Sequence, residues 1–174
     1  DLVVVNLYPF SSEPSIDLID IGGPAMVRGA AKNYANVAVV VDPEDYIGVL
    51  ATVAVNRGGS LGNESWRRAL ARKAFAHTAT YDTQIVHWLD ELEAEEAREA
   101  GEEPEPPDTL HIAANRIRVL GKGENGNQKP AAMYAVKSDD ALAPGRFELI
   151  EGNPGWVNWT DQDRALITLL QMAA

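Results

Sequence analysis

Two short runs of apolar, mostly β-branched residues constrain the fold of this chain more than any other feature. Residues 2–5 read Leu-Val-Val-Val and residues 37–41 read Val-Ala-Val-Val-Val, which is typical of parallel strands that are covered on both faces. Between them we expect a helix from about Gly23 and Pro24 to Asn33, since proline suits a first helical turn. A strand, a helix and a strand in this order predict an α/β protein with a parallel sheet and flanking helices.

Three acidic residues follow the second apolar run, at Asp42, Glu44 and Asp45. Asp42 has the side chain of a helix N-cap, Pro43 fits the first helical position, and acids stabilise the positive end of a helix. A metal ion could also use three carboxylates, but capping accounts for all of them. We therefore expect a helix start here.

A long helix is expected after a Gly-rich break at residues 56–62. It runs from Trp66 to about Gly101 and carries apolar residues at the spacing of a buried stripe. These residues are Tyr81, Ile85, Trp88, Leu89 and Leu92. Residues 101–107 contain three prolines and a glycine, cannot continue a helix, and predict a linker between domains.

The sequence beyond the linker has shorter, mixed segments, which we interpret as the opening of a second domain. These segments are residues 111–120, 131–136 and 147–152, followed by a helix from about Thr160. The predicted organisation is a first domain at 1–100, a linker at 101–109 and the start of a second α/β domain at 110–174. Because the chain begins with Asp rather than Met, we expect it to be a piece of a longer protein.

The negative charge of the chain is concentrated in one segment. The net charge is -11, and residues 90–108 hold ten acids and one arginine. A solvated helix end and linker explain this segment, and a docking surface for a basic partner is the alternative. Nucleic-acid binding is not expected, because no cluster of Lys and Arg offers a face for phosphates. No apolar run is long enough to span a membrane, and the chain contains no Cys, so we expect a cytoplasmic protein without disulfides.

Polar residues lie where the first apolar run ends and where the predicted helix begins. Asn6 and Tyr8 follow the run, and Asp20 precedes Gly22 and Gly23. The helix must return from the carboxyl edge of the sheet, so these residues should meet at one rim, where the glycines would let a ligand approach the main chain. Polar rims also occur in βαβ units that bind nothing, so the spacing leaves both interpretations open.

Lys32 is expected near the C-terminus of the same helix. A lysine there is ordinarily a solvated cation that interacts favourably with the helix dipole. Arg28 can likewise be interpreted as a solvated cation or as a functional residue.

Four motifs, in this order and spacing, resemble one enzyme family. They are Asn-Leu-Tyr-Pro-Phe at 6–10, Asp-Ile-Gly-Gly leading to Arg-Gly-Ala-Ala-Lys-Asn at 20–33, Pro-Glu-Asp-Tyr at 43–46, and Lys-Ala-Phe-Ala-His-Thr-Ala-Thr-Tyr-Asp at 73–82. The family is the bifunctional purine-biosynthesis enzyme AICAR formyltransferase/IMP cyclohydrolase. The resemblance implies a methylglyoxal-synthase-like cyclohydrolase domain in the first part of the chain and the start of a formyltransferase domain in the second.

The resemblance also implies roles for individual residues. Tyr8 matches a tyrosine that lines the family's cyclohydrolase site, Asp20 matches a catalytic aspartate, and Lys32 matches a lysine that donates or accepts a proton. The matches to nucleotide-contacting positions are Val5, Asn6, Ile21 and Gly22.

The implied reaction closes the purine ring of formyl-AICAR to give IMP and water. It calls for no metal and no organic cofactor, whereas the formyltransferase half of the family takes its formyl group from 10-formyltetrahydrofolate. The expected partners are the purine nucleotide intermediate and, by analogy, a second copy of the chain in a homodimer.

Two departures from the family limit what the chain alone is expected to do. The family's Lys-Thr-Leu-His-Pro motif and its phosphate-binding Ser, Lys and Thr lie upstream of residue 1, so we expect a sheet truncated at its N-terminus, with residues 2–5 as an exposed edge, and an inactive fragment. In the second part, Arg-Tyr-Gly-Glu-Asn-Pro-His-Gln of the family corresponds to Gly-Lys-Gly-Glu-Asn-Gly-Asn-Gln at 121–128. Formyl transfer by this chain alone is therefore not expected. The alternatives are a nucleotide-sensing module without catalysis and a fragment that binds nothing.

Overall fold

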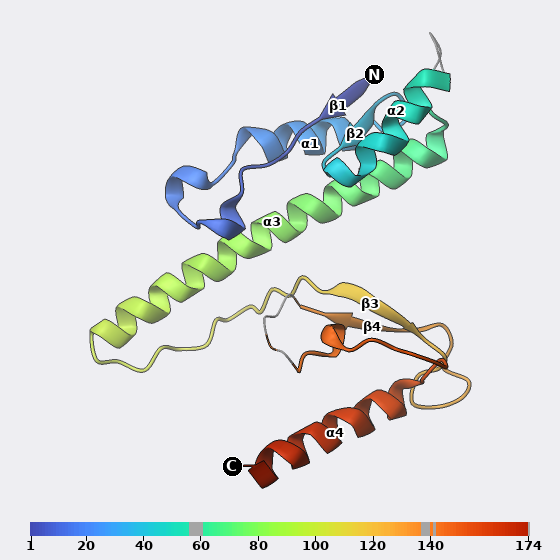
Figure 1. Ribbon diagram of the computed structural model, residues 1–174. Coiled ribbons are helices and arrows are strands. Elements are labelled where there is room, and N and C mark those ends of the chain that lie inside the picture. Colours follow the sequence, from blue (N-terminus) through green and yellow to red (C-terminus); the bar gives the residue numbers. More distant parts are fainter. Residues whose placement is uncertain (56–60, 137–139, 141, 174) are drawn as a thin grey trace. The chain divides into compact units, whose positions relative to one another are not determined.

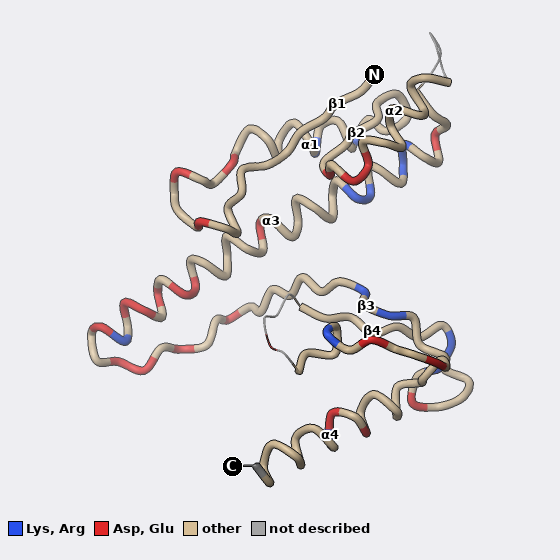
Figure 2. The backbone as a smooth tube through the Cα atoms, viewed as in Figure 1, with Lys and Arg blue, Asp and Glu red and all other residues tan. Residues whose placement is uncertain are grey.

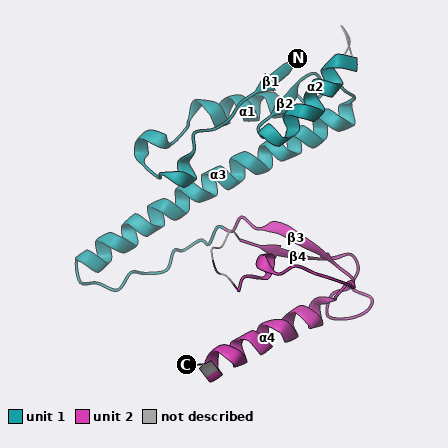
Figure 3. Ribbon diagram, viewed as in Figure 1, with its two compact units in different colours: residues 1–111 teal, residues 112–174 magenta. Residues whose placement is uncertain are grey.

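The protein divides into two compact units. The computed structural model describes residues 1–55, 61–136, 140 and 142–173. Unit 1 is Asp1–His111 and unit 2 is Ile112–Ala174 (Figure 3). Among the described helices, none combines the length and the apolar character that a membrane crossing requires.

Unit 1 is built on a parallel pair of strands with flanking helices. Strand β1 (Leu2–Val4) pairs in parallel with β2 (Ala38–Val40), with Leu2 opposite Ala38, and helix α1 (Gly22–Lys32) connects them (Figure 1). Helices α2 (Tyr46–Val55) and α3 (Glu64–Glu99) follow. The predicted strand, helix and strand are confirmed, and so is the α/β class.

The two strands differ in burial. All three residues of β2 are buried, as predicted for a strand covered on both faces. The same prediction is wrong for β1, in which Leu2 is 41% and Val4 48% exposed. Within the described residues β1 pairs only with β2, so its other edge carries no neighbouring strand.

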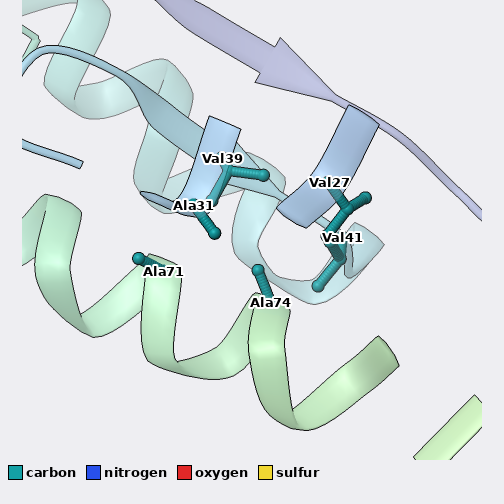
Figure 4. Close-up of a cluster of buried hydrophobic side chains, with 6 residues drawn as sticks. All are labelled: Val27, Ala31, Val39, Val41, Ala71 and Ala74. Atoms are coloured by element: carbon teal, nitrogen blue, oxygen red, sulfur yellow. The ribbon is translucent and has the colours of Figure 1, made fainter. Parts of the chain in front are cut away.

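Small residues allow α1, β2 and α3 to pack closely. One core cluster joins these elements, and Figure 4 shows its side chains meeting between the strand and the two helices. Its members are Val27, Ala31, Val39, Val41, Ala71 and Ala74. Because the alanines have short side chains, α3 lies near the backbone of α1 and β2, and a larger residue at Ala74, which is fully buried, would clash.

The chain after β2 turns as the sequence predicts. The Asp42 carboxylate accepts a hydrogen bond from the Glu44 N–H at 2.9 Å, and Pro43 occupies the first helical turn. The turn is a short 3-10 helix, η3 (Pro43–Asp45), and α2 begins immediately after it. The Gly-rich break at 56–62 falls mostly on residues 56–60, which lie outside the described residues.

The apolar stripe on α3 is buried only in part. Tyr81 is 6% exposed, and Ile85 and Trp88 are half-buried. Phe10, in the 3-10 helix η1 (Phe10–Ser12), packs against Tyr81 and Trp88. Leu89 and Leu92 are exposed, so the predicted stripe is wrong at these two positions, which lie beyond the contact with Phe10.

The acidic segment forms the end of α3 and the chain that follows it (Figure 2). Nine of its ten carboxylate residues are exposed, and only Asp90 is half-buried. The predicted solvated helix end is confirmed. Gly101, just beyond the helix, has a φ of 78°, which a glycine adopts without strain.

Unit 2 pairs a hairpin with one helix. Strands β3 (Asn115–Leu120) and β4 (Ala131–Ala135) are antiparallel, and α4 spans Trp156–Ala173. Leu120, Met133 and Trp159 form its core. The predicted helix is confirmed, but it begins four residues before Thr160.

Candidate functional site

The carboxyl edge of the β1–β2 pair is the part of unit 1 where polar residues gather. Parallel strands end at the same edge of a sheet, and ligands of open α/β proteins bind there. The Val5 N–H donates to the Val40 carbonyl at 3.0 Å, which extends the pairing by one residue. Asn6 and Tyr8 then leave the sheet, and Tyr8 is 54% exposed.

The Asp20 carboxylate is held at the start of α1. One of its oxygens accepts the Gly23 N–H at 2.7 Å, and the other accepts the backbone N–H of Tyr8 at 3.4 Å. The first N–H groups of a helix have no partner within the helix and carry partial positive charge, so a carboxylate is favoured here. The structure thus brings Asp20 and Tyr8 together, as the sequence predicts.

The two glycines after Asp20 have different surroundings. A Cβ added to Gly23 would collide with the Asp20 carboxylate and would lie 2.8 Å from a methyl carbon of Leu7. A Cβ added to Gly22 would meet nothing within 4 Å. Gly23 is therefore required by the packing around Asp20, whereas Gly22 faces open space and can admit a ligand. Ile21, the residue before the helix, is 76% exposed.

Asn6 has a partner that the sequence did not indicate. The Tyr46 hydroxyl donates to Asn6 Oδ1 at 3.3 Å. Tyr46 begins α2 and packs against the buried residues of β2, so its ring is held in place. The contact joins the chain that leaves β1 to the chain that leaves β2.

An ion-pair cluster lies after the end of β2. Lys73 Nζ is 2.7 Å from Asp42 Oδ2 and 2.8 Å from Asp45 Oδ2. The hydrogen bond from Lys73 lowers the pKa of Asp42 below its ordinary value, and the hydrogen bonds to Asp42 and Asp45 raise the pKa of Lys73. Both effects favour the charged forms, so the lysine binds the turn to α3. Among the described residues no group of three or more His, Cys, Asp or Glu is arranged to hold a metal ion.

Lys32 is not brought together with Asp20. It is the last residue of α1 and is exposed, while Asp20 lies before the first residue of the same helix. Eleven helical residues span about 16 Å, or three turns, which is farther than a lysine side chain reaches. Within one copy of the chain, Asp20 and Tyr8 share a rim and Lys32 lies at the opposite end.

A buried arginine fixes the backbone that follows Lys32. Arg67 is 6% exposed, and among the described residues its guanidinium donates to four backbone carbonyls at 2.6–3.1 Å. The acceptors belong to Tyr34, Ala35, Leu61 and Gly62. Arg28, one helical turn before Lys32, lies over the ring of Phe75 at 5.5 Å.

The sequence model of the AICARFT/IMPCHase bienzyme matches residues 30–173. The chain belongs to this family. It is 48% identical over 169 residues to a bifunctional purine biosynthesis protein PurH of Sorangium cellulosum, which covers 88% of this chain and 32% of that protein. It is 42% identical over 179 residues to the PurH of Myxococcus xanthus, covering 98% of this chain and 32% of that protein.

The chain thus spans about a third of the length of these PurH relatives. A solved structure, that of ForH, is 39% identical and aligns with 49% of this chain and 48% of its own, at a TM-score of 0.44. That TM-score is too low for the alignment to define the fold.

In unit 2, the stretch that differs from the bienzyme motif forms a compact loop. The backbone N–H of Gly123 donates to the Gln128 carbonyl at 3.0 Å, and the Asn125 N–H donates to Gln128 Oε1 at 2.9 Å. A Cβ at Gly121 would lie 2.7 Å from the carbonyl oxygen of Asn153. The glycine that stands where the motif has arginine is therefore required by the local backbone of this chain.

Sequence reasoning missed Tyr46, Arg67 and Tyr81 as parts of the site's surroundings. Tyr46 and Tyr81 lie in motifs that carried the resemblance, but nothing in the sequence assigned them a contact. Arg67 lies outside those motifs and stands beside Arg68, so nothing in the sequence indicated that this arginine is the buried one.

Proposed function

We propose that this chain contributes the cyclohydrolase site of de novo purine biosynthesis, which closes formyl-AICAR to IMP with loss of water. Membership of the AICARFT/IMPCHase bienzyme family supports the reaction class. The observation that carries the proposal is the Asp20 carboxylate, held by the Gly23 N–H at the start of α1 and beside Tyr8 at the carboxyl edge of the sheet.

The chemistry of ring closure matches these groups. The attacking amide nitrogen is a poor nucleophile, so its proton must be removed as the carbon–nitrogen bond forms. Charge that develops on the formyl oxygen must be stabilised, and that oxygen must be protonated before it leaves as water. We assign proton transfer to Asp20 and Lys32, and orientation of the base or donation to the oxyanion to Tyr8. No metal or organic cofactor is needed for these steps.

The nucleotide is proposed to contact the rim between these residues. Val5 and Asn6 lie at the end of β1, and Ile21 and Gly22 lie at the start of α1. The open space at Gly22 supports close approach of an acceptor oxygen to the Gly22 N–H, whereas the Gly23 N–H already binds Asp20 and Pro24 has no N–H.

The position of Lys32 gives the proposal a further requirement. Within a single copy, a carboxylate before α1 and a lysine at its end cannot both reach the same reacting atoms. We therefore propose a homodimer in which Lys32 of one copy serves the Asp20 site of the other. A twofold axis would then create two equal sites, each drawing on both copies.

The second unit is proposed to be the beginning of a formyltransferase domain. In this assignment residues 1–100 are an incomplete IMP cyclohydrolase domain, 101–109 the linker and 110–174 the incomplete start of the AICAR formyltransferase domain. The co-substrate of that half would be 10-formyltetrahydrofolate, and the whole enzyme would act in the cytoplasm.

A nucleotide-sensing module without catalysis is the second candidate. It is favoured by the loop at 121–128, where a tight contact with Asn153 excludes the arginine of the family motif. Such a module would bind IMP stoichiometrically and never turn over.

IMP synthesis from formyl-AICAR, followed by absorbance, tests the proposal. The assay compares this chain with an extended form, in which the upstream segment of the Sorangium cellulosum relative precedes residue 1. Activity in the extended form is the expected result. IMP binding without turnover in a cooperatively folding extended form would refute ring closure and favour the sensor.

A further inference from the structure

Tyr81 makes two hydrogen bonds to the backbone that leads into Asp20, the candidate catalytic residue. Its hydroxyl accepts the backbone N–H of Asp20 at 2.8 Å and donates to the carbonyl of Leu18 at 3.0 Å. A phenol can accept and donate at once, which phenylalanine cannot do. A side chain of α3 thereby fixes the segment that carries Asp20 at two points, the Leu18 carbonyl and the N–H of Asp20 itself.

The ring of Tyr81 contacts the segment that carries Tyr8, the other residue of the rim. Phe10 is 1% exposed and packs edge-on against Tyr81, with ring centroids 6.0 Å apart. It follows Tyr8 by two residues, so the burial of Phe10 sets where the Tyr8 segment runs. One side chain thus holds the Asp20 segment by its hydroxyl and the Tyr8 segment by its ring.

The burial of Tyr81 makes these contacts rigid. The residue is 6% exposed, and its helix packs against α1 and β2 through the Ala71 and Ala74 core. Leu18 ends the short 3-10 helix η2 (Ile16–Leu18), and Asp20 lies between η2 and α1, so Tyr81 holds the chain where these two helices are joined. Helix α3 therefore fixes the position of the segments that carry Asp20 and Tyr8.

We propose that Tyr81 is a positioning residue of the ring-closure site, which sets the place of the Asp20 carboxylate relative to the nucleotide. This inference rests on the proposed cyclohydrolase function. Tyr81 itself touches no reacting atom and acts through the backbone of Asp20.

The test compares Tyr81→Phe with Thr78→Val in this chain and in the extended form. Tyr81→Phe keeps the ring and its packing and removes only the hydroxyl. Thr78 is a matched control, because it is fully buried one turn earlier on α3 and its hydroxyl donates to the Phe75 carbonyl at 3.1 Å, away from Asp20. The two measurements are hydrogen exchange at the Asp20 amide and the separate kcat and KM of ring closure.

Tyr81→Phe is expected to accelerate exchange at the Asp20 amide and to lower kcat by roughly ten- to a hundredfold with KM nearly unchanged, because a small misplacement of a catalytic group is costly. Thr78→Val should leave both quantities at the wild-type value. An unchanged Asp20 exchange rate in Tyr81→Phe would overturn the contact, and faster exchange with unchanged kcat would overturn the positioning role.

Failure of the proposed function would look different. If the wild-type extended form formed no IMP, ring closure would be refuted for every variant alike. The exchange measurement would still decide whether Tyr81 holds Asp20, with faster exchange in Tyr81→Phe supporting the contact and equal exchange overturning it.

Discussion

The two ends of helix α1 are built in opposite ways. At its start, the Asp20 side chain is fixed by N–H groups of Gly23 and Tyr8, and its backbone is fixed by Tyr81. At its end, the Lys32 side chain is exposed, while the backbone beyond it is held by the buried Arg67. At the start of α1 the carboxylate itself is held in one position, whereas at its end an exposed lysine precedes a fixed stretch of backbone. This difference suits a site that is completed by a second copy.

Removal of the Asp20 charge should have the largest effect. In Asp20→Asn the amide oxygen can still accept the Gly23 N–H, so the fold should survive while proton transfer is lost. We expect the ring-closure rate of the extended form to fall by about 10²- to 10⁴-fold. Asp17→Asn, an exposed neighbour, is the control. Equal rates in the two variants would remove Asp20 from the mechanism.

Loss of Arg67 should destabilise the opposite end of α1. Arg67→Met keeps much of the buried stem but leaves carbonyls of the turn after Lys32 without their donor. We expect the free energy of unfolding to fall by about 2–4 kcal/mol. Chemical denaturation measures this, with the exposed Arg68→Met as the control, for which little change is expected. A similar small loss of unfolding free energy in both variants would mean that Arg67 does not fix the backbone that follows Lys32.

The adjacent glycines at the start of α1 separate packing from ligand access. Gly23→Ala should cost about 1–3 kcal/mol of stability, since its Cβ would crowd Asp20 and Leu7. Gly22→Ala should be neutral or stabilising by up to about 1 kcal/mol, because the site is open and alanine favours the helix. Thermal melts compare the two. The KM for formyl-AICAR should nevertheless rise in Gly22→Ala, and an unchanged KM would mean that the nucleotide does not approach this position.

The smallest effect is expected at the Lys73 ion pairs. Because its pKa is lowered, Asp42 contributes stability above its unfolded pKa of 3.8, and this stability is lost as pH falls through the folded pKa. Because its pKa is raised, Lys73 contributes stability below its unfolded pKa of 10.5, and this stability is lost as pH rises through the folded pKa.

Lys73→Met should therefore be less stable than wild type between these limits, and the difference should vanish in acid. Both partners are partly exposed, so solvent screening limits it to at most about 1 kcal/mol, and added salt should reduce it further. Denaturation at several pH values measures the difference, with the exposed Arg72→Met as the control. A difference that persisted in acid would point to packing rather than charge.

Local patterns in the sequence predicted the elements well and the connections between them poorly. The apolar runs at 2–5 and 37–41, and Pro24 between them, predicted β1, α1 and β2, because strand and helix patterns depend on neighbouring residues. The meeting of Asp20 with Tyr8 followed from the same topology. Tyr81 and Arg67 contact residues far away in the sequence, and no local pattern encodes such a contact.

The separation of Lys32 from Asp20 could also have been predicted from the sequence. Both residues belong to one motif of the family, and for that reason they were expected in one site. However, Asp20 precedes α1 and Lys32 is its last residue, so the helix places them at opposite ends. The apolar run at 2–5 did not by itself predict the exposure of Leu2 and Val4, because burial depends on which elements lie beside a strand; the expected exposed edge came from the resemblance to the family.

Mixing two inactive variants tests the central claim most directly. Asp20→Asn and Lys32→Ala are each prepared in the extended form, shown to be inactive, and allowed to exchange subunits. If each site takes Asp20 from one copy and Lys32 from the other, a mixed dimer contains one intact site, and a random mixture should recover about a quarter of wild-type ring-closure activity. No recovery, in a mixture that has demonstrably exchanged subunits, would contradict the shared site.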